Sequence, residues 1–259
     1  QDGRLALWDV ATNQSTFYPV DPVPGAAPLL AVAYSQDASR VAASSRGHEA
    51  RIWKLAGSTL ELERSLTHPV PTGKGGNWVF DVSFHPEDPS RVITAAGDGR
   101  ARIWTGGMPT EPCPEISIHA HAKTSPAVDA RILRASFSPS GVITATTTSV
   151  RAWQRTGSQT PCWQQTWEVR HGLPINDVGW GPDSRILTAS DDGTARVSDG
   201  RNGNRILTLR NGVAVKAAAF DRQGRHVVTG DSDGAVRRWR VTPDALAKYL
   251  EEASTACLS

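Results

Sequence analysis

The chain has 259 residues, with 28 basic and 26 acidic side chains and a formal net charge of +2. This near balance excludes a strong overall field toward nucleic acid or an anionic membrane, so we predict neither as a partner. No apolar run approaches the roughly 18 residues that a membrane span needs. The three cysteines are odd in number and widely spaced, which argues against a disulfide framework and favours a reducing, cytoplasmic compartment.

Tryptophan marks an internal repeat. Five of the nine tryptophans close a short alternating segment, and these are Trp8, Trp53, Trp104, Trp153 and Trp239. A sixth copy of the segment ends on Ser198 instead. The copies recur about every 40 to 50 residues, a period typical of propeller blades or helical arrays. An arginine stands two positions before most of them, for which we predict a structural role, either over an indole ring or paired with a neighbouring carboxylate.

Taken in chain order, residues 1–20 contribute a Trp strand and an outer strand. Each later unit starts with an apolar segment that ends on an aromatic residue, at 30–34, 79–84, 132–137, 175–180 and 215–220. A polar turn, a β-branched segment, a tight turn and the Trp strand follow. A weaker outer strand completes every unit except the last. Helical spacing is absent from these units, so they predict an all-β fold of short antiparallel strands.

These repeats resemble the WD40 family of β-propellers over residues 2–241. In that family each blade carries a His, a Ser or Thr, an Asp and a Trp. The matching residues are His68, Thr94, Asp98 and Trp104; His171, Thr188 and Asp192, with Ser198 at the Trp position; and Thr229, Asp233 and Trp239, with Asn211 at the His position. The resemblance implies a propeller domain at 1–241, built of four-stranded antiparallel blades. It has a partial blade at 1–20 and blades at about 29–67, 77–118, 131–170, 174–210 and 214–241, the last of which ends after its third strand.

These four residues of a blade, which we call the tetrad, have a structural explanation. A buried carboxylate must be paired or hydrogen-bonded, and a histidine and a hydroxyl beside an indole N–H can satisfy it. We therefore predict no catalytic residue and no cofactor. His119 and His121 alternate on one strand face, but a third ligand at suitable spacing is missing, so we predict no metal site either.

Long connections enter three successive blades, at residues 21–28, 68–77 and 119–131. Loops vary without disturbing the scaffold that holds them, so this sector is the predicted recognition surface. The predicted contributors are Arg46, His48, Lys74, Trp78, Lys123 and Asp129. The alternative is that these are merely variable loops.

Residues 242–259 form a predicted C-terminal helical extension, with Thr242 as cap and an apolar stripe of Leu246, Leu250, Ala253 and Cys257. The extension resembles that of large bacterial WD40 proteins in which a propeller follows a signalling ATPase, of the STAND type, or a Ser/Thr kinase. The alternative is a helix that packs on the propeller itself. The incomplete first and last units predict a fragment of a seven-bladed ring, or else an irregular smaller ring.

The predicted function is a non-catalytic scaffold or sensor module that binds a protein or peptide partner within a larger bacterial signalling or defence protein. Further blades or domains of the same parent protein are also predicted as partners. The alternative is a propeller hydrolase or lyase with a site in the central channel. Its charged groups would come from innermost strands, at Asp81, Asp177 or Arg134.

Overall fold

The computed structural model describes residues 4–9, 11–19, 27–57, 59–70, 77–105, 115–117, 131–138, 141–156 and 162–242. Among these residues the regular structure is β-strand, apart from one short 3-10 turn, η2 (Pro182–Ser184). No helix in the described part of the chain is long and apolar enough to cross a bilayer. The described residues divide into two compact units: the first within 1–137, 141–146 and 151–165, the second within 138–140, 147–150 and 166–259.

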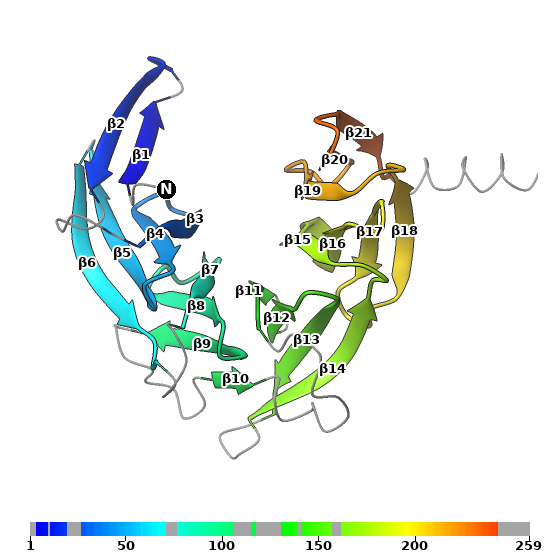
Figure 1. The fold of residues 1–259 in the computed structure, drawn as a ribbon, viewed down its shortest axis with the longest axis horizontal. Coiled ribbons are helices and arrows are strands. Elements are labelled where there is room, and N and C mark those ends of the chain that lie inside the picture. Colours follow the sequence, from blue (N-terminus) through cyan, green and yellow to red (C-terminus); the bar gives the residue numbers. More distant parts are fainter. Residues whose placement is uncertain are drawn as a thin grey trace, which may run out of the picture. The chain divides into compact units, whose positions relative to one another are not determined.

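The strands form six sheets in chain order (Figure 1). The first sheet holds β1 (Arg4–Asp9) and β2 (Gln14–Pro19). The second holds β3 (Leu29–Tyr34), β4 (Arg40–Ser45), β5 (Glu49–Ala56) and β6 (Thr59–Thr67). The third holds β7 (Val79–Phe84), β8 (Arg91–Ala96), β9 (Arg100–Thr105) and β10 (Glu115–Ser117).

The remaining three sheets follow the same order. The fourth holds β11 (Arg134–Ser138), β12 (Gly141–Ala145), β13 (Ser149–Arg155) and β14 (Trp163–Arg170). The fifth holds β15 (Ile175–Trp180), β16 (Arg185–Ser190), β17 (Thr194–Asp199) and β18 (Arg205–Arg210). The sixth holds β19 (Val215–Phe220), β20 (His226–Asp231) and β21 (Val236–Arg240).

The all-β fold of four-stranded antiparallel sheets is therefore confirmed. Such a series of sheets is the architecture of β-propeller blades. A single propeller domain over 1–241 and a seven-bladed ring stay predictions. The predicted helix of the C-terminal extension lies outside the described residues, apart from its cap, Thr242.

The second strand of each four-stranded sheet is the most buried. β4, β8, β12 and β16 each contain at least four consecutive buried residues. Strands covered on both faces read as continuous runs of apolar or small residues, which explains both the β-branched segments of the later repeats and the small residues of β4. In the first unit, Ile93, Ile103 and Ile132 are buried in one core cluster with Trp153.

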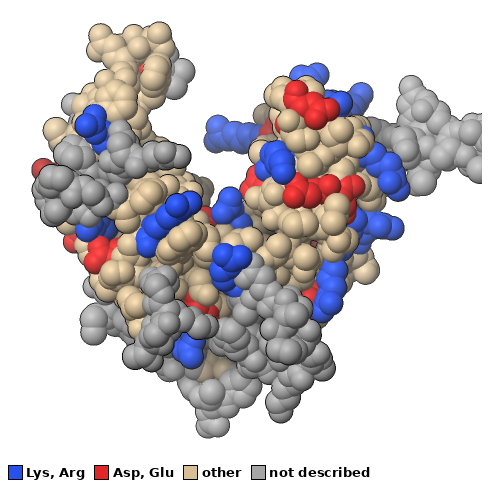
Figure 2. Space-filling view, viewed as in Figure 1, with Lys and Arg blue, Asp and Glu red and all other residues tan. Residues whose placement is uncertain are grey.

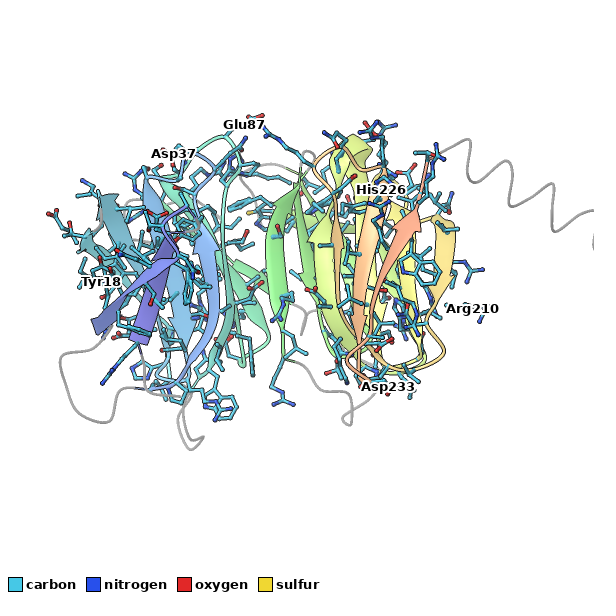
Figure 3. All side chains as sticks on the ribbon, turned by 90° about the horizontal axis from the view of Figure 1, so that it is seen from above. Tyr18, Asp37, Glu87, Arg210, His226 and Asp233 are labelled. Carbon is cyan, nitrogen blue, oxygen red and sulfur yellow. The ribbon has the colours of Figure 1, made fainter. Side chains whose placement is uncertain are left out.

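A bulge recurs at the start of the first strand in four of the sheets. Between the first and second strands the register shifts at the same place, at Leu29/Ala31, Val79/Asp81, Ile175/Asp177 and Val215/Ala217. Such a bulge adds one residue and re-aims its side chain. In β7 the added residue is Phe80. The turns after β3 and β7, which contain Asp37 and Glu87, lie at the opposite ends of these strands from the bulges (Figure 3).

The turn between the second and third strands ends on a residue with a left-handed backbone. Gly99 and Gly193 take this position with φ of 78° and 79°, which glycine adopts without a Cβ clash. In the turn after β4 the same position is His48, with φ of 58°. A positive φ is uncommon outside glycine and indicates that the surrounding structure imposes it.

Innermost-strand carboxylates join neighbouring sheets within each unit. Asp81 Oδ2 accepts a hydrogen bond of 3.1 Å from the Ala135 backbone N–H, and Asp177 Oδ2 accepts one of 3.2 Å from Ala218. Arg134 donates to the carbonyl oxygen of the preceding Leu133 at 3.0 Å. The two carboxylates that the enzyme alternative names thus have partners in the following sheet, whereas the bond of Arg134 is local.

The structure contradicts one inference from composition. Cys162 is buried and disulfide-bonded, whereas the odd cysteine count argued against disulfides. The other two cysteines, Cys113 and Cys257, both lie outside the described residues. Counting cysteines failed here because an odd count of three still allows one disulfide.

Candidate functional site

The first unit contains a largely buried polar cluster of His68, Thr94, Asp98, Arg102 and Trp104. Thr94 Oγ1 lies 2.9 Å from His68 Nε2 and accepts a hydrogen bond of 2.8 Å from the Trp104 indole N–H. The Arg102 guanidinium lies 3.0 Å from His68 Nδ1 and donates to Asp98 at 2.7 Å. Arg102 thus stands between the histidine and the carboxylate.

The partners of His68 determine its protonation. A guanidinium can only donate, so Nδ1 accepts from Arg102 and the ring proton resides on Nε2, which donates to Thr94. Burial, and next the charge of Arg102, lower the pKa of His68 to about 3. Burial alone would raise the pKa of Asp98, but the hydrogen bond and charge of Arg102 outweigh it and lower that pKa.

The second unit repeats the cluster with His171, Thr188, Asp192 and Arg196. His171 Nδ1 lies 2.9 Å from Asp192 Oδ2, and Nε2 lies 2.8 Å from Thr188 Oγ1. Arg196 donates to the same carboxylate oxygen at 2.7 Å. Burial lowers the pKa of His171 although the Asp192 hydrogen bond opposes it. The neutral ring then carries its proton on Nδ1, the opposite tautomer to His68.

The third set of predicted residues meets on β20 and β21. Trp239 donates to Thr229 Oγ1 at 2.9 Å, and Asn211 donates to the same oxygen at 3.1 Å. The carboxylate beside Asn211 is Asp231, at 3.4 Å, whereas the predicted Asp233 is exposed. The structure therefore places Asp231 where spacing predicted Asp233.

The recurring arginines pair with carboxylates. The pairs are Arg51 with Glu49, Arg102 with Asp98, Arg196 with Asp192 and Arg237 with Asp231. Each of these clusters satisfies its own charges and hydrogen bonds, so it stabilises its sheet. Within the described residues, no group of three His, Cys, Asp or Glu side chains is arranged to hold a metal ion.

We expect acid to destabilise the fold before carboxylates titrate. The pKa of His68 is 6.5 in the unfolded chain and about 3 in the fold, so between these values the unfolded state binds more protons. The contribution of the neutral His68 ring to the free energy of unfolding is therefore fully present above pH 6.5. It falls as the pH drops, by about 2 kcal/mol between pH 6.5 and pH 5. Urea unfolding across this range measures it, with His68→Asn as the variant that flattens the slope. An unchanged slope in His68→Asn would contradict the assignment.

A second feature is an exposed row of two arginines and two aromatic rings in the first unit. The Arg46 guanidinium lies 4.5 Å from the centre of the Trp78 ring. Trp78 meets Phe80 edge to face at 5.9 Å between ring centres, and the Arg131 guanidinium lies 5.8 Å from the Phe80 ring. We call these four residues the cation–aromatic row.

The backbone under Trp78 is held in place on both sides. Asn77 is buried, accepts a hydrogen bond of 2.9 Å from the Asp98 N–H and donates one of 3.0 Å to the Pro69 carbonyl. The Trp78 carbonyl accepts from Gly97 at 2.9 Å. The Trp78 ring nevertheless stays 37% exposed. A rigid backbone with an exposed aromatic ring is the kind of anchor that protein interfaces use.

Three of the six predicted surface residues are described. The structure brings Arg46 and Trp78 into contact, and His48 is half-buried in the same turn as Arg46. Lys74, Lys123 and Asp129 lie outside the described residues, as do His119 and His121.

Sequence reasoning missed Phe80 and Arg131. Phe80 stands at the bulge position where other repeats have Leu30, Asn176 or Lys216, and only the strand register of the structure identifies that position.

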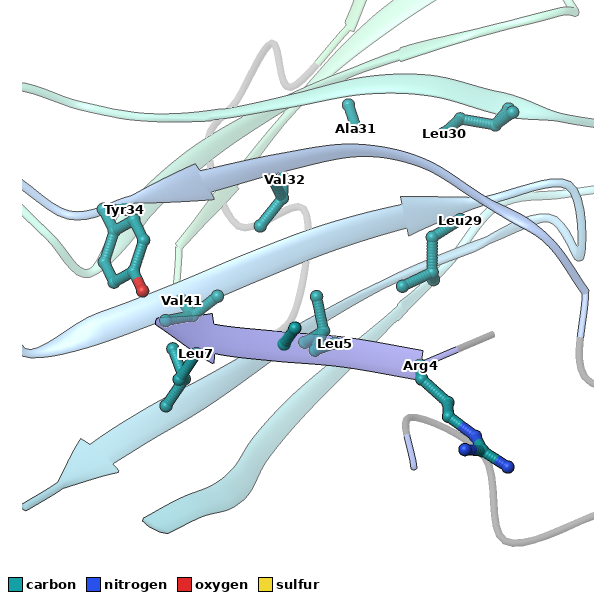
Figure 4. A pocket seen from close by; sticks show the side chains of 10 residues that line it. Arg4, Leu5, Leu7, Leu29, Leu30, Ala31, Val32, Tyr34 and Val41 are labelled. Carbon is teal, nitrogen blue, oxygen red and sulfur yellow. The ribbon is translucent and has the colours of Figure 1, made fainter. Parts of the chain in front are cut away.

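An apolar groove of about 350 Å³ lies beside β1 and β3 (Figure 4). Leu5, Leu7, Leu29 and Val32 are among its lining residues. It offers no polar group beyond Arg4 and Tyr34 to orient a ligand, so it is a weaker candidate than the cation–aromatic row.

A basic pocket of about 320 Å³ lies in the second unit, lined by Arg225, His226, Arg238, Arg240 and Thr242. His226 begins β20, as Arg91 and Arg185 begin β8 and β16. Those two arginines lie over Phe137 and Phe220 of the following sheet. His226 therefore occupies the strand position that packs on the following sheet in those two repeats, and its Nδ1 lies 2.9 Å from Asp221 Oδ2.

Comparison with known proteins identifies the repeats. The family model for the WD domain, G-beta repeat, matches residues 67–105, 163–199 and 203–240. Each matched segment contains one of the three polar clusters, so these three segments match the WD40 repeat model.

The chain is also similar to plant proteins described as guanine nucleotide-binding protein subunit beta. The potato (Solanum tuberosum) protein is 27% identical over 255 residues, covering 92% of this chain and 63% of the relative. The Zea mays protein is 28% identical over 260 residues with the same coverage, and the Arabidopsis thaliana protein is 28% identical over 246 residues, covering 89% and 60%. The chain thus spans about 60–63% of the length of these relatives.

Proposed function

We propose that this chain is a non-catalytic interaction module, a scaffold or sensor that binds a protein or peptide partner through the cation–aromatic row. The observation that carries the proposal is the Arg46 guanidinium stacked at 4.5 Å on an exposed Trp78. Tryptophan and arginine dominate the binding energy of protein interfaces. Lys74, Lys123 and Asp129 are proposed to contribute from the connections next to the row.

The relatives support a protein partner. They are named as subunits, which are parts of larger assemblies by definition. We keep the prediction that neither nucleic acid nor a membrane is a partner. The net charge of +2 supports it, as do both signs of charge on the visible face of each unit (Figure 2).

The wider setting is a separate proposal. A larger bacterial signalling or defence protein is supported by the resemblance of residues 242–259 to the extension of such proteins, whereas the relatives found here are plant proteins. A cytoplasmic location was inferred from the cysteine count, and the disulfide at Cys162 removes that support.

The test is affinity capture with the immobilised 259-residue chain from a lysate of its source cells. We expect one or more proteins retained by the native chain to be reduced about tenfold by Trp78→Ala or Arg46→Glu. Arg210→Glu, an exposed charge reversal on β18 of the other unit (Figure 3), serves as control and should retain them. The double variant Lys74→Glu/Lys123→Glu tests the adjoining connections. Equal capture by native, Trp78→Ala and Arg46→Glu chains would overturn the proposal.

A further inference from the structure

Arg46 is a cation whose charge the described part of the chain leaves uncompensated. Its backbone N–H bonds to the Pro28 carbonyl at 3.0 Å, and its guanidinium contacts the Trp78 ring. The side chain is exposed. Among the described residues no carboxylate pairs with this guanidinium.

The carboxylates in neighbouring turns are already occupied. Glu49 pairs with Arg51 at 3.0 Å. Asp98, in the equivalent turn of the next sheet, pairs with Arg102 at 2.7 Å. Both carboxylates are therefore already engaged by other guanidinium groups.

The equivalent position in the second unit is arranged differently. Asp191 follows β16 as Arg46 follows β4, and its N–H bonds to the Pro174 carbonyl just as that of Arg46 bonds to Pro28. The Asp191 carboxylate accepts from Lys216 at 2.6 Å and from Asn176 at 2.7 Å. The charge of Asp191 in this turn is therefore neutralised by Lys216, whereas no described carboxylate neutralises Arg46 in the equivalent turn.

The sequence next to the row adds further positive charge. Residues 71–76, before Trp78, contain Lys74 and no acidic residue. Residues 118–130, before Arg131, contain Lys123 and one acidic residue, Asp129. With the histidines neutral, residues 71–76 therefore carry a net charge of +1, whereas Lys123 and Asp129 cancel in residues 118–130.

We propose that the row recognises an acidic peptide segment, a deduction that rests on the function proposed above. An anionic group of the peptide, carboxylate or phosphate, pairs with the Arg46 guanidinium, and a neighbouring apolar side chain of the peptide lies on the exposed part of Trp78. Guanidinium binds either anion through two parallel hydrogen bonds. The indole ring supplies apolar area and holds the guanidinium in place.

The experiment measures fluorescence anisotropy of labelled peptides with the full chain. The probes are repeats of Glu-Leu-Gly, phosphoserine-Leu-Gly and Gln-Leu-Gly. We expect the first two to bind and the neutral third to fail, with binding weakened by added salt. Arg46→Ala should weaken binding about tenfold, whereas the matched control Arg210→Ala should not. The better of the two anionic probes identifies the anion.

Two outcomes would overturn the inference. One is equal binding of the Gln peptide, and the other is an equal effect of Arg46→Ala and Arg210→Ala. If captured proteins still depend on Trp78 while the anionic peptides do not bind, the acidic partner is wrong but the binding surface stands. If capture is also insensitive to Trp78 and Arg46, the proposed function itself fails.

Discussion

Replacing Asp98 by Asn is expected to lower the free energy of unfolding by about 3 kcal/mol, because breaking a buried ion pair by removing one of its members is strongly destabilising. The Arg102 side chain is only 4% exposed, and its guanidinium lies 2.7 Å from Asp98 Oδ2. The substitution changes charge while keeping shape. Urea unfolding followed by tryptophan fluorescence measures it.

Glu49→Gln is the matched control for Asp98→Asn. Glu49 pairs with Arg51 in the preceding sheet, with the two side chains 28% and 20% exposed. Solvent screens such pairs, so the expected loss is under about 1 kcal/mol. Similar losses in the two variants would contradict a special role for the buried cluster.

Thr94→Val is expected to lower the free energy of unfolding by about 2 kcal/mol, since buried donors left unpaired cost about 1–3 kcal/mol each. The Thr94 hydroxyl is fully buried and accepts from both the Trp104 indole and the His68 ring. Valine keeps the volume but offers no acceptor. The measurement is again the urea midpoint, with the slope of the transition unchanged.

Ser44→Ala is the counterpart of Thr94→Val. Ser44 is fully buried in β4, and its hydroxyl has no hydrogen-bond partner among the described residues. Removing an unpaired buried hydroxyl is expected to be neutral or stabilising. A loss in Ser44→Ala equal to that in Thr94→Val would show that burial alone, and not the cluster, determines the effect.

The fold could be predicted from the sequence because its signal is local and repeated. Each repeat contains its own strand alternation and turn residues, and most repeats contain the Trp strand. A strand that is weakly marked in one repeat can therefore be assigned from its equivalent in another. Trp104 and Trp153 take equivalent places, and their indoles donate to Thr94 and Thr144 at the same 2.8 Å.

Which carboxylate joins each cluster could not be predicted, because it depends on the lengths of the neighbouring side chains. Asp233 has the same spacing from Trp239 as Asp98 from Trp104. Asn211, however, is shorter than the histidine it replaces. Asp231, two residues after Thr229 on the same face of β20, enters the cluster from the strand itself.

The candidate site was predicted only as separate residues. Arg46 and Trp78 come from different sheets, so their contact depends on how those sheets pack within the first unit. Phe80 joins them through a bulge, a shift in register that strand patterns do not reveal.

The most direct test of this account compares binding and stability in Arg46→Ala. Arg46 is exposed and is not paired with any described carboxylate, so its loss should leave the free energy of unfolding in urea within about 0.5 kcal/mol of the native value. Anisotropy with the Glu-Leu-Gly peptide should nevertheless show affinity reduced about tenfold. Native affinity in a stably folded Arg46→Ala chain would contradict the claim that the cation–aromatic row is a binding surface for an acidic partner.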